Sequence, residues 1–139
     1  MGNLSGVLAT QDSSDVPIMK SGAVASSGNV ANANAVSTLA AKVGQVGYLT
    51  GFQLTAGAAT AAAAVTATVT GLAGGTMSIS FGFPSTASGI GGASLSASFY
   101  PALQASAANT AIVVTLPAGG SGNTIAATSL QGFYADAGV

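Results

Sequence analysis

Alternating apolar and polar residues dominate the chain from about residue 23 onward, and this pattern predicts β-strands with one buried and one exposed face. In the clearest runs, the polar positions are almost all threonine or serine. These runs are Val65, Ala67 and Val69 against Thr66, Thr68 and Thr70; Met77, Ile79, Phe81 and Phe83 against Thr76, Ser78, Ser80 and Gly82; and Leu95, Ala97 and Phe99 against Ser94, Ser96 and Ser98. We expect each apolar row to face a core and each hydroxyl row to face solvent.

Further strands are predicted from less regular patterns. An early strand is expected over Val30–Leu39 and the last one over Thr124–Tyr134. The run Ala111–Leu116 is almost continuously apolar and rich in β-branched residues, which favours a strand covered on both faces. Between Tyr48 and Thr55 the pattern also predicts a strand with two faces. One face is expected to carry Tyr48, Thr50, Phe52 and Leu54, and the other Leu49, Gly51, Gln53 and Thr55.

Glycine and proline separate these runs and indicate turns. Gly71, Gly74 and Gly75 predict a hairpin between the Val65 and Met77 strands. The other breaks are Gly44 with Gly47, Gly57–Ala62, Pro84–Gly92, Pro101–Asn109 and Pro117–Asn123. Seven or eight strands at this spacing predict an all-β, single-domain antiparallel β-sandwich, jelly-roll-like, over residues 23–139.

Residues 1–22 differ from the rest and are predicted to form an extended N-terminal arm. They contain a short apolar cluster, Val16, Pro17, Ile18 and Met19. Pro17 opposes a helix and favours extended backbone before it. We interpret the four residues as a partner-contact segment that docks on a neighbouring subunit; the alternative is a solvated tail.

Charge is almost absent. Charged residues make up 4% of the chain, against roughly a quarter in average soluble domains. From Val43 to Ala135 there is no Asp, Glu, Lys, Arg, His or Cys. General acid–base catalysis and metal binding need such groups, so we expect no enzyme activity, no cofactor and no metal site. The few lysines give no basic patch for nucleic acid, and no strongly apolar run is long enough for a membrane helix.

Several local motifs are best interpreted as ordinary structure. The N-terminus has neither the basic nor the apolar segment of a secretory signal, so a cytoplasmic site of synthesis is expected. Asp12-Ser13-Ser14-Asp15 lacks the remaining ligands of a calcium loop. The glycine-rich segments Gly89–Gly92 and Gly119–Gly122 lack the lysine of a phosphate-binding loop.

Two binding alternatives remain open. The ladder of Thr66, Thr68 and Thr70 resembles the arrays of ice-binding surfaces, although threonine also suits any exposed strand face. Tyr48, Tyr100 and Tyr134 could stack on sugar rings in a lectin-like sandwich. The chain carries little charge and has few large apolar residues for a core, and both features favour a homo-oligomer, a dimer or a trimer.

Three segments carry a resemblance to a known group of proteins. They are YLTGFQLTAGAATAAAAVTATVTGLAGGT (48–76), NTAIVVTLPAGGSGNTIAATSLQGF (109–133) and VASSGNVANANAV (24–36). In residue composition and strand order, these segments resemble small jelly-roll virion proteins of tailed bacteriophages. The resemblance implies a protein that decorates or cements the capsid exterior, with the major capsid protein as its partner. The alternative is a receptor- or carbohydrate-binding module of a head fibre or tail fibre. The resemblance assigns no functional residues to this chain.

Overall fold

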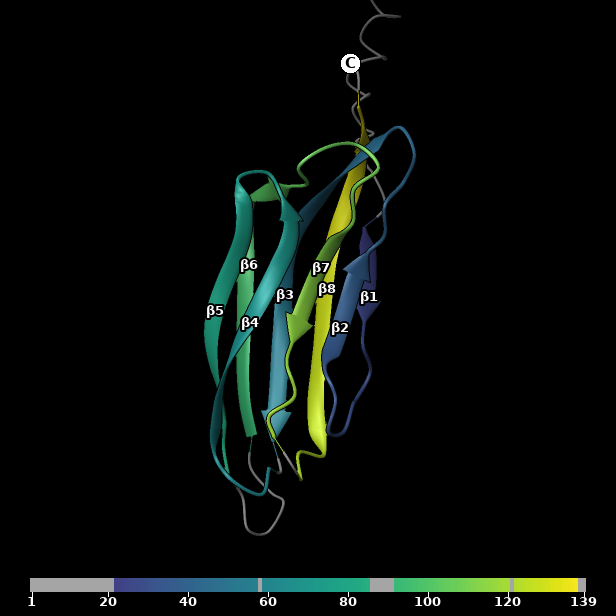
Figure 1. The fold of residues 1–139 in the computed structure, drawn as a ribbon. Helices are drawn as coiled ribbons and strands as arrows, with labels where there is room; N and C mark the ends of the chain where they lie inside the picture. The colour runs from purple at the N-terminus through teal and green to yellow at the C-terminus, as the bar shows by residue number, and fades with distance from the viewer. Residues whose placement is uncertain (1–21, 58, 86–91, 121, 138–139) are drawn as a thin grey trace, which may run out of the picture.

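Eight β-strands form two four-stranded antiparallel sheets in the computed structural model, which describes residues 22–57, 59–85, 92–120 and 122–137 (Figure 1). The strands are β1 (Ala23–Ser26), β2 (Ala35–Leu39), β3 (Gln45–Gly57), β4 (Ala63–Leu72), β5 (Gly75–Phe83), β6 (Gly92–Gln104), β7 (Ile112–Leu116) and β8 (Ile125–Asp136). No helix occurs within these ranges.

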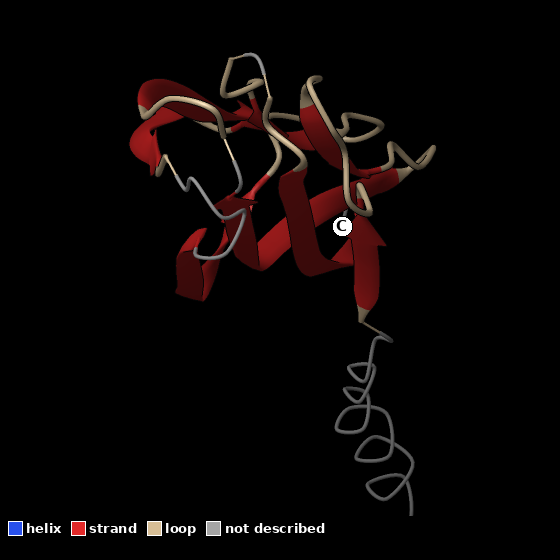
Figure 2. Cartoon of the chain, turned by 90° about the horizontal axis from the view of Figure 1, so that it is seen from below, coloured by secondary structure: helices blue, strands red, loops and turns tan. Residues whose placement is uncertain are grey.

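The strand order within the two sheets is β1-β8-β3-β6 and β2-β7-β4-β5. Strands β4 and β5 form the innermost hairpin, and β3 with β6, β2 with β7 and β1 with β8 pair successively outside it. This nested pairing is the connectivity of a jelly roll. The predicted all-β antiparallel sandwich, with eight strands, is confirmed; Figure 2 views the strands end-on.

Alternation places the core between the two sheets, as the sequence predicts. In β4 the inward Ala67 and Val69 are buried, whereas Thr66 on the other face is exposed. In β5 Phe81 and Phe83 are buried and contact each other edge to face, with their ring centroids 6.1 Å apart. The largest buried side chains elsewhere are Phe52, Leu49, Leu54, Ile112, Leu116 and Leu130.

The predicted β4–β5 hairpin is confirmed. Leu72 pairs with Gly75, so the turn consists of Ala73 and Gly74. Gly74 has a φ of 95°, which is strained for residues with a side chain and accessible to glycine.

One predicted strand face is wrong, because a β-bulge interrupts β3. Relative to β8, the strand gains an extra residue at Thr50 between Leu49 and Gly51. A bulge reverses the side on which the following residues point. Leu49 and Phe52 are therefore both buried, whereas Tyr48 and Thr50 do not share the face of Phe52 as predicted.

Three other boundaries or environments also differ from expectation. β2 begins only at Ala35, not at Val30. β6 continues through Pro101 to Gln104, into the segment predicted to be a loop, because Leu103 and Gln104 still pair with β3. β7 is buried on one face only, and Val113 and Thr115 on its other face are half-buried.

A polar pair in the core connects the two sheets. The Thr128 hydroxyl in β8 donates a hydrogen bond to the Ser37 hydroxyl in β2, with 3.0 Å between the oxygens, and both side chains are at most 2% exposed. Since each hydroxyl satisfies the other, two polar residues are accommodated where the alternation pattern alone predicts apolar ones.

Candidate functional site on the outer face of the β1-β8-β3-β6 sheet

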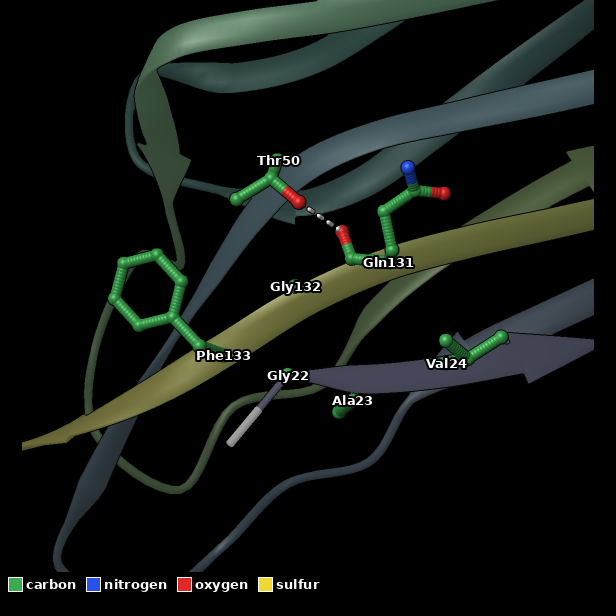
Figure 3. Close-up of a pocket in the computed structure, with 7 residues that line it drawn as sticks. All are labelled: Gly22, Ala23, Val24, Thr50, Gln131, Gly132 and Phe133. Atoms are coloured by element: carbon green, nitrogen blue, oxygen red, sulfur yellow. Dashed lines mark hydrogen bonds between the residues drawn. The ribbon is translucent and has the colours of Figure 1, made fainter. Parts of the chain in front are cut away.

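A shallow depression of about 480 Å³ lies on the outer face of the β1-β8-β3-β6 sheet, where β1 begins (Figure 3). Three strands, β1, β3 and β8, contribute its walls. The residues that line it are Gly22, Ala23, Val24, Thr50, Gln131, Gly132 and Phe133. None was singled out by the sequence patterns as a functional residue.

The β3 bulge shapes this depression. Because Thr50 is the extra residue, its side chain turns toward β8, and its hydroxyl donates a hydrogen bond to the main-chain carbonyl of Gln131 at 3.0 Å (Figure 3). This bond occupies a carbonyl at the point where the regular ladder between β3 and β8 is disrupted. The bulge is therefore fixed by a side chain of its own.

Gly132 permits the two strands to approach at the same point. It pairs with Leu49, and a Cβ atom at this position would overlap the main-chain carbonyl of Tyr48. Any larger residue would force β3 and β8 apart and alter the depression. A glycine is thus required at position 132, because the backbones of β3 and β8 approach too closely there for a side chain.

An aromatic pair borders the depression. The rings of Tyr48 in β3 and Phe133 in β8 are stacked, with centroids 5.0 Å apart and planes 7° from parallel. Both side chains are half-buried. On the other side, Val24 of the short edge strand β1 is 79% exposed. The surface therefore offers apolar contact area that is left free by residues 22–57, 59–85, 92–120 and 122–137.

The chemistry of this surface is that of a neutral binding site. None of its lining residues is ionisable, and the Thr50 hydroxyl already donates to the backbone. The exposed Gln131 side-chain amide can both donate and accept hydrogen bonds. The arrangement can bind an uncharged partner by packing and amide hydrogen bonds, and it offers no proton-exchanging group.

The three tyrosines do not form one surface. Tyr134 lies on the opposite side of β8 from Phe133, donates its hydroxyl proton to the Ala40 carbonyl at 2.7 Å, and has the Lys42 Nζ 4.1 Å from its ring centroid. Burial raises the pKa of its hydroxyl above the usual value. Tyr100 in β6 is fully exposed. Tyr134 therefore does not share a face with the stacked Tyr48 and Phe133 rings.

The threonine ladder of β4 lies on the outer face of the other sheet. Thr66 pairs with Ser80 and Thr68 with Ser78 of β5, so hydroxyls continue across both strands. Val16, Pro17, Ile18 and Met19 lie outside the described residues, as do Asp12, Asp15 and most of Gly89–Gly92.

One signal in the sequence could have located the depression. The alternation breaks between Leu49 and Phe52, because these two core residues are three positions apart, whereas residues on one face of a regular strand are an even number of positions apart; such a break indicates a bulge. The partner residues Gln131 and Phe133 could not be paired with Thr50 from sequence, since the register of β3 with β8 is a long-range property.

Two further features are absent from the described ranges. Within them, no cluster of three or more His, Cys, Asp or Glu side chains is placed to hold a metal ion. The same part of the chain contains no helix of the length and hydrophobicity needed to cross a membrane.

Comparisons with known protein families, with curated proteins and with solved structures find no match to this chain.

Proposed function

We propose that the protein is a non-enzymatic structural component of a tailed-phage virion that decorates or cements the capsid exterior. The partner is the major capsid protein. The protein is made in the host cytoplasm and acts by shape-complementary contact.

The observation that carries this proposal is the uncharged surface of the sandwich. The outer face of the β1-β8-β3-β6 sheet presents an apolar depression edged by Val24 and Phe133, and no ionisable residue lines it. A surface of this kind associates through buried area and backbone or amide hydrogen bonds. A repeated protein lattice provides many identical neutral sites for such contacts.

The test is quantitative mass spectrometry of purified virions. We expect a copy number in fixed proportion to the major capsid protein, set by the capsid lattice. Absence from virions, or a few copies confined to the tail, would refute the proposal.

Salt dependence adds a second readout. Because the depression carries no charge, binding to capsids is expected to change little between about 0.1 and 1 M salt, conditions over which the Debye length falls from about 10 to 3 Å. In the same assay, Phe133→Ala should weaken binding. Gln53→Ala, an exposed position elsewhere on the same sheet, serves as the matched control.

One observation favours a second candidate, a carbohydrate-binding module of a head or tail fibre. Phe133, one ring of the stacked Tyr48–Phe133 pair, lines the same depression as Gln131, and sites that combine aromatic rings with amides are common for neutral ligands. A glycan array separates the two functions. Specific binding lost on Phe133→Ala and kept in Tyr100→Ala would favour this candidate over capsid decoration.

A further inference from the structure

The four sheet edges differ in how they are protected against pairing with another chain. Natural edge strands are shortened, bulged, or interrupted by proline or charge. β1 has 4 residues and β2 has 5, so both edges are short. β6 contains Pro101 and a register shift opposite Thr50.

β5 has none of these protections. It has 9 residues, Gly75–Phe83, without proline or charge, and the bulge near its start lies in β4. It is the last strand of the order β2-β7-β4-β5, so among the described strands only β4 pairs with it. Its far edge presents backbone donors and acceptors that no other described strand pairs with.

The core is also incompletely covered on this flank of the sandwich. In β5 the inward Met77 and Ile79 are half-buried, and so are the inward Leu95 and Ala97 of β6, the edge strand of the other sheet. On the opposite flank, the inward residues of β2 are all buried, and the half-buried inward residues of β1 are two alanines, Ala23 and Ala25. On the flank formed by β5 and β6, apolar side chains that point toward the core therefore remain partly exposed to solvent.

We propose that this flank is an interface with a second copy of the chain, in which two β5 strands pair antiparallel across a two-fold axis at Ile79. Ile79 is the middle residue of Gly75–Phe83, so this register pairs the whole strand with its copy. A two-fold axis is the commonest symmetry of soluble oligomers.

The residue pattern of β5 fits this register on both faces. Directly opposed residues of an antiparallel pair share a face, so Met77 meets Phe81 of the second copy on the core side. Ser78 meets Ser80 of the second copy on the exposed side. The apolar row then continues from one sandwich into the next, and the absence of charge along β5 leaves nothing to repel an identical strand.

The two exposed serines allow a test of both interface and register, using the full chain in analytical ultracentrifugation. In S78K/S80K each lysine opposes a lysine of the second copy, and we expect dimer affinity to fall at least about tenfold. In S78K/S80E each lysine opposes a glutamate, and we expect affinity within about threefold of the parent. An axis at Ser78 or Ser80 would bring like charges together in S78K/S80E.

The matched control is Q53K/T55K, which places the same charges on exposed positions of the interior strand β3 and should leave the dimer unchanged. Circular dichroism verifies that each variant is folded, which is expected because positions 78 and 80 are exposed. A parent that is monomeric at all concentrations, a dimer unaffected by S78K/S80K, or equal dissociation of S78K/S80E and S78K/S80K would overturn the proposal. The measurement uses isolated protein, so it is independent of virion association.

Discussion

The hydrogen bond between Ser37 and Thr128 permits a sharp test of how the two sheets are held together. The two residues lie in different sheets and are at most 2% exposed, so removing one hydroxyl leaves the other buried without its partner. An unsatisfied buried hydroxyl costs about 1–3 kcal/mol. We therefore expect Ser37→Ala and Thr128→Val each to lower the free energy of unfolding by about 1–3 kcal/mol.

The double variant should behave differently. Thr to Val conserves shape and Ser to Ala removes only the hydroxyl, so S37A/T128V replaces the pair by apolar contact and should cost only about 0–1 kcal/mol. The cost of the double variant minus the summed costs of the single variants then comes to roughly −1 to −6 kcal/mol.

The measurement is urea unfolding followed by far-ultraviolet circular dichroism and tyrosine fluorescence, since the chain contains no tryptophan. Each kcal/mol corresponds to about 3 °C in melting temperature for a chain of this size. Ser96→Ala, at an exposed hydroxyl of β6, is the control and should stay within about ±0.5 kcal/mol. If the double variant costs the sum of the single variants, the two hydroxyls do not satisfy each other and the reasoning is refuted.

Three other predictions concern core packing, pH and the N-terminal segment. Phe81→Ala should lower the free energy of unfolding by about 3–5 kcal/mol, and Ser80→Ala by no more than about 0.5 kcal/mol; similar losses would contradict the assigned faces of β5. Because burial raises the pKa of Tyr134 above 10.0, the unfolded chain loses this proton first, so stability should be intact below about pH 10 and decline above it. Tyr134→Phe should flatten that decline in urea titrations, and an unchanged slope would exclude Tyr134 as its source. Deletion of residues 1–20 should leave near-native circular dichroism but weaken capsid binding at least about tenfold, since three apolar side chains contribute roughly 1.5–3 kcal/mol each when buried; full occupancy by the truncated protein under dilution would argue against a docking arm.

The strands and most of their faces were determined by the sequence alone. Alternation has the period of a β-strand, so Val69, Phe81 and Phe83 point inward wherever the backbone stays regular. Turn chemistry is equally local, and Gly74 marks the β4–β5 hairpin because glycine adopts its positive φ without strain. The near absence of charge, which underlies the proposed function, is likewise visible in the sequence.

Only the tertiary structure decided which strands meet and where regular pairing fails. Pairing of β3 with β8 joins segments far apart in the chain, and its bulge at Thr50 depends on Gly132 of the other strand, so neither strand alone specifies the depression. Burial of Ser37 and Thr128 is decided in the same way, because each hydroxyl is tolerated in the core only when the other lies opposite it. Edge or interior position is also a property of the assembled sheet. Among the described strands β5 pairs only with β4, although its residues alternate in the same way as those of the interior strand β4.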